Sequence, residues 1–132
     1  MAQNTTFRKV CTDMGHGLSV LTVAPVTNAH LAYKLVAPLG RNLQADVCGD
    51  NDVIAGFPYQ KSGRAGVANG EAVLLQDEGC FEAVASGTVH LNNPLTAGAA
   101  GTLRVAVVTT DFFQYKAVTE ALDGEVVTVK RW

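Results

Sequence analysis

The chain has 132 residues, a net charge of −2 and 48% hydrophobic residues. This length fits one domain with, at most, an additional arm, and the apolar content is enough to bury a core. The ten basic residues are scattered and form no basic stripe, so we expect no nucleic-acid partner. No stretch approaches the ~18 apolar residues of a membrane-spanning helix. We therefore expect no membrane partner and, because the start of the chain is polar, no signal peptide.

The N-terminal region, residues 1–27, is predicted to be an extended arm ahead of a domain formed by residues 28–132. Within residues 2–13, Phe7 and Val10 are the only large apolar side chains, and neither helical nor strand periodicity is sustained. Such a segment is either flexible or lies across a partner and orders there. Ordering costs roughly 1–2 kcal/mol per residue in backbone entropy, so Phe7 and Val10 would need pockets on that partner.

Short apolar runs follow, each stopped by Gly, Pro, Asn or Asp. Residues 18–26 alternate and are rich in β-branched side chains, which favours a strand, and this leaves open whether they belong to the arm or to the domain. Four further segments extend this pattern up to residue 57. They are a run at 31–37 turned by Pro38-Leu39-Gly40, a short strand or helical turn at 43–48, a turn at 49–52, and a strand at 53–57 that Pro58 ends.

The central stretch, residues 69–110, has the punctuation of a β-meander. After it, Phe113, Tyr115 and Ala117 share one face if the segment is extended. Asp123-Gly124 is a hairpin signal ahead of a last strand. The sequence therefore predicts an all-β fold, a small β-barrel or β-sandwich (β-tulip-like), with a surface loop of about ten residues at 59–69 that is long enough to suggest a functional role.

Few residues are candidates for catalysis, metal binding or phosphate binding. The three histidines lie far apart, and the nearest approach to a metal-ligand cluster is Cys11, Asp13 and His16, in the irregular start of the chain. No Gly-x-Ser-x-Gly elbow is present, and the glycine-rich segment 63–70 lacks the Lys-Ser/Thr ending of a phosphate loop. We therefore predict no catalytic residue, no cofactor, no metal and no enzymatic activity.

Cysteines and aromatic side chains give weaker indications. Cys11, Cys48 and Cys80 are odd in number and widely spaced, which favours reduced, buried thiols and assembly in a cytosol. The phenylalanines Phe57, Phe81 and Phe113 are predicted core residues. Trp132 would either fold back onto its own sheet or dock on a neighbour. Interfaces are enriched in Trp, Tyr and Arg, which makes Tyr59, Arg64 and Trp132 contact candidates.

The order of these turns and runs resembles small capsid decoration (cement) proteins of tailed bacteriophages. The resemblance covers the chain from about residue 31 to its end and consists of turn chemistry and apolar pattern. The matching segments are Val-Ile-Ala-Gly-Phe (53–57), Asn-Gly-Glu-Ala-Val-Leu-Leu (69–75), Ala-Val-Ala-Ser-Gly (83–87), Tyr-Lys-Ala (115–117) and Asp-Gly-Glu-Val-Val-Thr-Val (123–129).

This resemblance implies a structural virion protein, commonly a homotrimer, that binds the major capsid protein. It would sit on the outer surface of an icosahedral capsid at junctions between capsomers, and it would stabilise the shell against the pressure of the packaged genome after assembly in the host cytoplasm. Several side chains are then expected at the capsid or subunit interface. They are Phe7, Arg8, Val10, Tyr59, Arg64 and Trp132.

Two other functions remain open at this point. The first is a carbohydrate- or small-ligand-binding β module of a phage fibre or receptor-binding assembly, whose marker would be an exposed aromatic platform such as Tyr59, Phe112 and Tyr115. The second is a small hydrolase with a site assembled from distant acids. The absence of a local catalytic motif makes the hydrolase the weakest of the three hypotheses.

Overall fold

A computed structural model describes residues 17–26, 28–59, 70–77 and 79–132. These residues form strands and a single short 3-10 turn, so the predicted all-β fold is confirmed. In that part of the chain, no helix is long and apolar enough to cross a membrane. The elements in chain order are β1 (Leu18–Thr22), β2 (Tyr33–Leu39), β3 (Asn42–Val47), β4 (Phe57–Tyr59), β5 (Ala72–Gln76), β6 (Cys80–Val84), β7 (Pro94–Ala97), η1 (Ala99–Gly101), β8 (Leu103–Val105), β9 (Tyr115–Ala117) and β10 (Val126–Arg131).

The strands make two five-stranded sheets. The first has the order β2-β3-β1-β5-β4, and the second has the order β6-β10-β9-β7-β8. Strand β1 lies at the centre of the first sheet, parallel to β3 and antiparallel to β5. Residues 18–22 of the segment predicted as an arm therefore belong to a sheet. Residues 1–16 lie outside the described residues, and an arm there stays a prediction.

Period-two burial explains why these segments are strands. In β10, Val127 and Val129 are fully buried while Val126 and Lys130 are exposed. In β1, Val20 and Thr22 face the core in the same alternating way. Alternate side chains of a strand point to opposite faces, so each sheet has one buried face and one solvated face.

Each sheet curls until its two outer strands almost meet. One isolated bridge joins Tyr33 of β2 to Gly56 just ahead of β4, and another joins Ala85, just after β6, to Leu103 of β8. A Cβ on Gly56 would lie 2.8 Å from the backbone oxygen of Gln76, so the close packing of residue 56 against β5 needs glycine. Among the described residues neither ladder continues beyond its bridge, and the sheets are curled but are not closed barrels.

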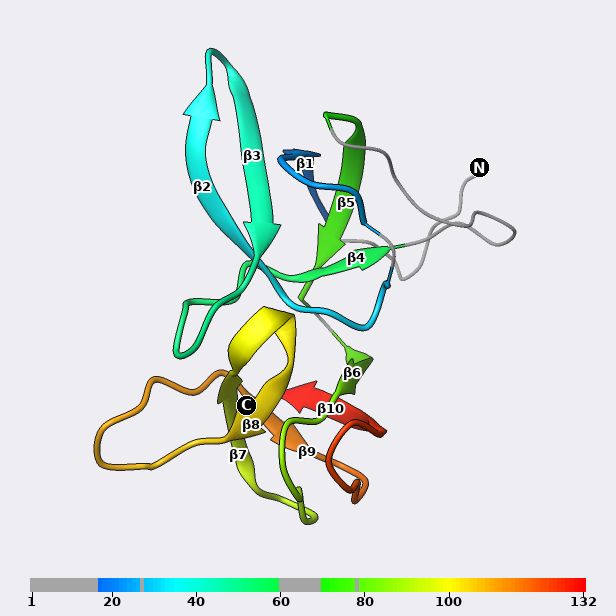
Figure 1. The fold of residues 1–132 in the computed structure, drawn as a ribbon, viewed down its shortest axis with the longest axis vertical. Helices are drawn as coiled ribbons and strands as arrows, with labels where there is room; N and C mark the ends of the chain where they lie inside the picture. Colours follow the sequence, from blue (N-terminus) through cyan, green and yellow to red (C-terminus); the bar gives the residue numbers. More distant parts are fainter. Residues whose placement is uncertain (1–16, 27, 60–69, 78) are drawn as a thin grey trace.

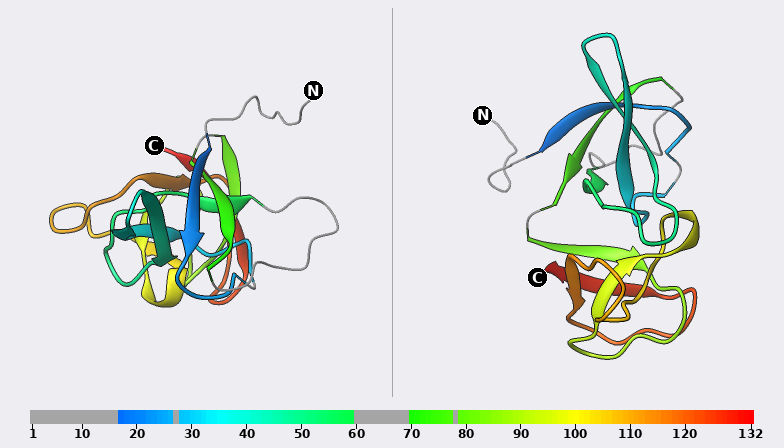
Figure 2. Two further views of the ribbon diagram at one scale, coloured as in Figure 1. Left: turned by 90° about the horizontal axis from the view of Figure 1, so that it is seen from above. Right: turned by 90° about the vertical axis from the view of Figure 1, so that its left-hand side faces the viewer.

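The two sheets stack along the long axis of the molecule, with β1 to β5 above and β6 to β10 below (Figure 1; the right-hand view of Figure 2 shows the same order). The larger core cluster lies where they meet, because it combines residues that precede β5 with residues of the second sheet. Phe57 from β4 stacks on Phe81 with ring centroids 5.1 Å apart and meets Tyr115 edge-on at 5.6 Å. This aromatic contact packs the first sheet onto the second.

Backbone hydrogen bonds at η1 hold the same junction. Ala32 donates to Gly101, Gly101 donates to Cys48, and Cys48 donates to Ala32, at 2.8–2.9 Å. Gly101 has φ +79°, and a Cβ there would lie 2.8 Å from a Val47 methyl group. The junction therefore needs glycine for both its backbone conformation and its space.

The structure decides three of the sequence predictions. The strand predicted at 53–57 is wrong, because residues 52–55 form no strand and β4 begins at Phe57 and contains Pro58. The ambiguous segment at 43–48 is a strand, β3. Cys48 is buried as predicted, whereas Cys80 is exposed. The physical reason for the first error is that the backbone of Ile54 is bonded by a side chain instead of by a neighbouring strand.

Candidate protein-contact surface

The side chains of the turn at Asp50, Asn51 and Asp52 connect the first sheet to the second. Each side chain reaches a different element. Asp52 accepts hydrogen bonds from Lys34 Nζ of β2 at 2.8 Å and from the Gly49 backbone N–H at 2.7 Å. Asn51 Oδ1 accepts from Thr96 Oγ1 of β7 and from the Phe112 N–H, both at 3.2 Å.

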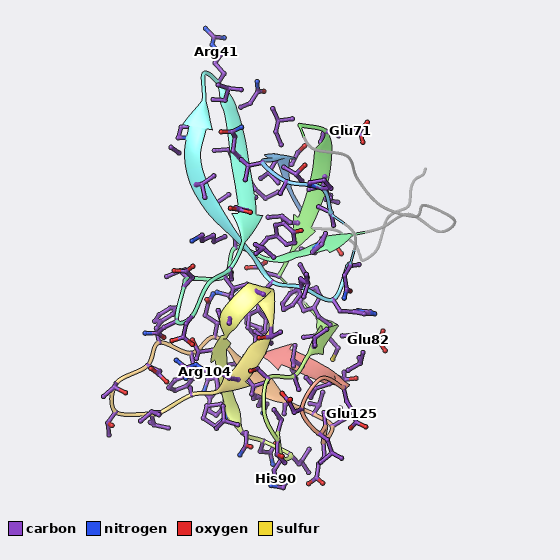
Figure 3. All side chains as sticks on the ribbon, in the orientation of Figure 1. Arg41, Glu71, Glu82, His90, Arg104 and Glu125 are labelled. Atoms are coloured by element: carbon purple, nitrogen blue, oxygen red, sulfur yellow. The ribbon has the colours of Figure 1, made fainter. Side chains whose placement is uncertain are left out.

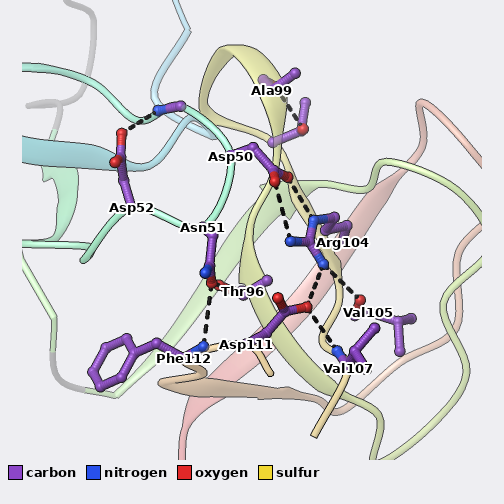
Figure 4. Close-up of polar contacts among 12 residues, drawn as sticks. Asp50, Asn51, Asp52, Thr96, Ala99, Arg104, Val105, Val107, Asp111 and Phe112 are labelled. Atoms are coloured by element: carbon purple, nitrogen blue, oxygen red, sulfur yellow. Dashed lines mark hydrogen bonds and ion pairs between the residues drawn. The ribbon is translucent and has the colours of Figure 1, made fainter. Parts of the chain in front are cut away.

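Arg104 of β8 completes the connection from below (Figure 4). Its Nε donates to Asp50 Oδ1 at 2.6 Å, and its Nη1 donates to Asp111 Oδ2 at 2.7 Å. The same Asp111 oxygen accepts the Val107 N–H at 2.8 Å. The hydrogen bond from Arg104, followed by that from Val107, lowers the pKa of the Asp111 carboxyl below its ordinary value. Arg104 therefore bridges two carboxylates through a fork of donors that lysine does not provide.

Gln114 adds a second connection between the same segments. Its Oε1 accepts the Ile54 N–H at 2.8 Å, and its Nε2 donates to the Ile54 carbonyl at 3.1 Å. Ile54 is buried in the main core. One side chain thus satisfies both backbone groups of a buried residue that no strand pairs.

These bonds hold an otherwise irregular segment, residues 106–114, which we call the clamped loop. In Figure 1 the part of it after β8 projects as a wide orange loop on the left of the second sheet. Four large apolar side chains on the clamped loop and on the adjoining segment 49–54 are 51–64% exposed. They are Val53, Val107, Val108 and Phe112. Single exposed apolar residues are ordinary; because these four lie on two segments that hydrogen bonds hold together, we take the two segments as the candidate contact surface.

The charges beside this surface are already paired within the chain. Lys34 pairs with Asp52, and Arg104 pairs with both Asp50 and Asp111. A partner that covers the apolar side chains would therefore not need to supply charges to neutralise them. The arrangement suits an uncharged, apolar partner surface.

Trp132 takes a position between the two alternatives that the sequence allowed. Its ring meets Phe113 edge-on at 5.3 Å, Lys116 Nζ lies 5.8 Å from its centroid, and its backbone N–H donates to Gln114 at 2.7 Å. The side chain nevertheless stays largely exposed. It has folded back onto the second sheet and still presents one side to solvent.

The other predicted interface residues are not brought together by the described structure. Phe7, Arg8, Val10 and Arg64 lie outside the described residues. The backbone of Tyr59 is in β4, opposite Leu74 of β5, and its side chain also lies outside the description. Their interface roles stay predictions.

Sequence reasoning missed the residues that build this surface. The sequence predicts only a turn at residues 49–52, whereas the carboxylate of Asp50 binds Arg104 and that of Asp52 binds both Lys34 and the Gly49 backbone N–H. Nothing in the local sequence marks Gln114. The available signal was the run of three polar residues, Asp-Asn-Asp, which is longer than a tight turn needs.

The structure excludes an exposed aromatic platform made of Tyr59, Phe112 and Tyr115. Tyr115 is fully buried and packs against Phe57 and Phe81, so it cannot present its ring to a glycan.

Two shallow hollows are present elsewhere. One of about 230 Å³ is lined by residues of 88–90 and 120–125, and one of about 280 Å³ lies beside Phe57 and Phe81. Within the described residues no three His, Cys, Asp or Glu side chains converge as metal ligands.

Taken together, the fold is that of an all-β protein with two stacked, curled sheets. Its most developed feature is an exterior apolar surface held in place by a polar network. No protein-family model matches the chain, and no curated protein matches it. Among solved structures, the chain is similar to the N-terminal base of the head fibre protein gp8.5 of bacteriophage phi29, with a TM-score of 0.71 and 16% sequence identity. The match covers 90% of this chain and 95% of that chain, and it extends over both sheets.

Proposed function

We propose that this protein is a structural component of a tailed-phage virion that binds the outside of the icosahedral shell and stabilises it. The observation that carries the proposal is the fold shared with a phage head fibre base over nearly the full length of both chains. The clamped loop supports it, since a protein that works through its exterior needs an apolar surface fixed in one conformation.

The proposed partner is the major capsid protein at junctions between capsomers, and the proposed active form is a homotrimer. Several copies of one apolar contact, held on one body, attach far more tightly than a single contact because each bound copy raises the effective concentration of the next. Linking neighbouring capsomers in this way would oppose their separation under the pressure of packaged genome.

Binding is tested by co-sedimentation of the purified protein with shells from the same source. Phe112→Asp and Val108→Asp place a charge in the proposed contact, and each is expected to reduce bound protein at least tenfold. Leu122→Asp is the matched control, because Leu122 is equally exposed but lies on the turn before β10, away from the clamped loop. Equal binding by all three variants would contradict the role of the clamped loop, and a wild-type protein that does not sediment with shells would refute the proposed function.

Stabilisation is tested separately from binding. Shells with and without the bound protein are heated, and release of their DNA is followed with an intercalating dye. The proposal expects release at a higher temperature for the decorated shells. Identical release curves at full occupancy would leave an attachment function and remove the cementing one.

A further inference from the structure

The solvated face of the second sheet carries two lysines that pair with no carboxylate of the described chain. Lys130 of β10 lies directly opposite Lys116 of β9. Tyr115, Ala117 and Val129, which adjoin them along the strands, are buried. Because side chains alternate along a strand, both lysines point to the solvated side. The two ammonium groups are therefore neighbours on one face of the sheet.

The charge of this lysine pair is not balanced by its surroundings. Like charges directly opposite each other in a sheet repel, which destabilises the pairing. Lys34, by contrast, pairs with Asp52 at 2.8 Å. Cys80 and Pro94, which lie opposite the two lysines on their other sides, are uncharged. Glu82, two residues along β6 from Cys80, adds one negative charge to this face against two positive charges. The lysine pair therefore leaves positive charge available to an anion from outside the chain.

An exposed aromatic ring stands beside the same lysines. The Nζ of Lys116 lies over the Trp132 ring, 5.8 Å from its centroid, and Phe113 meets that ring edge-on at 5.3 Å. The Trp132 backbone N–H donates to the Gln114 carbonyl at 2.7 Å, so both the ring and the main chain are held. The residue is nevertheless 62% exposed. We call Lys116, Lys130 and Trp132 the lysine–tryptophan face.

The chemistry of this face indicates the class of its ligand. Two ammonium groups attract an anion, and the negative π-face of an indole packs against the C–H groups that a sugar ring presents on one side. Strands β9 and β10 each have a neighbour on both sides, so a peptide cannot add there as a further strand. The basic residues of the whole chain are scattered, and its net charge is −2, which does not provide the basic stripe of a nucleic-acid site.

From these observations we propose that the lysine–tryptophan face binds an anionic saccharide, one that carries carboxylate or phosphate groups. A sugar ring stacks on Trp132 while its acidic group meets the ammonium groups of Lys116 and Lys130. This binding goes beyond shell attachment and does not depend on it. Because the charges are exposed, water and salt screen the attraction. Affinity for one short oligosaccharide is therefore expected to be weak and to fall as the salt concentration rises.

The fluorescence of Trp132 reports directly on this site, because it is the only tryptophan of the chain. The full chain is titrated with a galacturonic acid oligosaccharide, with a phosphate-bearing mannose oligosaccharide and with a neutral galactose oligosaccharide of the same length. At least one of the anionic probes is expected to change the fluorescence and to bind at least tenfold more tightly than the neutral probe, with affinity that falls in higher salt. No response to either anionic probe, or equal affinity for the neutral one, would overturn the proposal.

Variants measured by isothermal titration calorimetry assign the binding to these residues, with circular dichroism confirming the fold. Lys130→Gln is expected to raise the dissociation constant of the anionic probe at least threefold, and Trp132→Ala at least tenfold. Arg41→Gln is the matched control, because it removes one positive charge at the tip of the β2–β3 hairpin in the first sheet (Figure 3), and it should leave the constant unchanged. Unchanged binding by either site variant, or equal weakening by the control, would overturn the proposal. Poly-glutamate that binds as tightly as the saccharide would assign the site to acidic peptides and overturn it as well.

Discussion

Gln114→Ala tests the connection between the clamped loop and the segment that leads into β4. The side chain is the hydrogen-bond partner of both the N–H and the carbonyl of Ile54, at 2.8 and 3.1 Å. Ile54 belongs to the main core cluster. Truncation to alanine removes both bonds and leaves two backbone groups beside a buried side chain with no partner.

The expected loss of stability follows from those two groups. A typical intramolecular hydrogen bond contributes about 1 kcal/mol net, and a buried group left without a partner costs about 1–3 kcal/mol. Because Gln114 is only partly buried, water would reach one of the two groups, and we expect a total loss of about 2–3 kcal/mol. For a chain of this length, about 1 kcal/mol lowers the melting temperature by roughly 3 °C. The variant should therefore melt about 6–9 °C below wild type.

Thermal and urea unfolding followed by circular dichroism measure this loss. Gln114→Glu is the informative companion, because a carboxylate keeps the acceptor for the Ile54 N–H but turns a second acceptor toward the Ile54 carbonyl. It should also be less stable than wild type. Lys130→Ala, on the exposed face of β10, is the control and should stay within about 0.5 kcal/mol of wild type. A melting temperature for Gln114→Ala within 2 °C of wild type would refute the reasoning.

Three further predictions concern titratable and buried groups. The hydroxyl of Tyr115 is buried near the Asp77–Arg131 ion pair, and no described group meets it in hydrogen-bonding geometry. Tyr115→Phe should therefore leave the unfolding free energy unchanged or raise it by up to about 1 kcal/mol. A decrease in the unfolding free energy of more than about 1 kcal/mol, measured by urea unfolding, would show that the hydroxyl has a hydrogen-bond partner. Burial raises the pKa of the Cys48 thiol to about 12. At pH 8, iodoacetamide should therefore alkylate the exposed Cys80 in native protein but Cys48 only in unfolded protein, with the modified residues located by peptide mass spectrometry. Rapid alkylation of Cys48 in native protein would contradict this prediction. The pKa of Asp111 is lowered from its ordinary value of 3.8, chiefly by the hydrogen bond from Arg104. A carboxyl whose pKa is lowered by folding stabilises the folded state above its ordinary pKa, and this stabilisation is lost as the pH falls through the folded-state pKa. Melting temperatures should therefore decline more steeply below about pH 4 for wild type than for Arg104→Gln, and parallel curves would argue against the ion pair.

The sequence was informative wherever local chemistry decides the structure. The β-branched alternation in residues 18–26 and the apolar runs on either side of Asp77-Glu78-Gly79 correspond to β1, β5 and β6. The turn at Asp123-Gly124 is also present, with Gly124 at φ +83°. In these segments propensity, burial period and turn residues agree with the final fold.

Long-range partners explain what could not be predicted. The apolar run at 53–57 has the composition of a strand, but Gln114, 60 residues away, occupies the backbone groups of Ile54. The carboxylates at Asp50 and Asp52 gained their roles only when folding brought Arg104 and Lys34 beside them. Pairings of this kind depend on topology, which spacing along one chain does not reveal.

The isolated bridges at Tyr33–Gly56 and Ala85–Leu103 have a consequence for behaviour at high concentration. Open sheets tend to polymerise, because the unpaired backbone of one molecule adds to that of the next. In this fold each sheet turns its own borders toward each other, which reduces the backbone available for such addition. We therefore expect this fold to resist edge-to-edge polymerisation at high protein concentration.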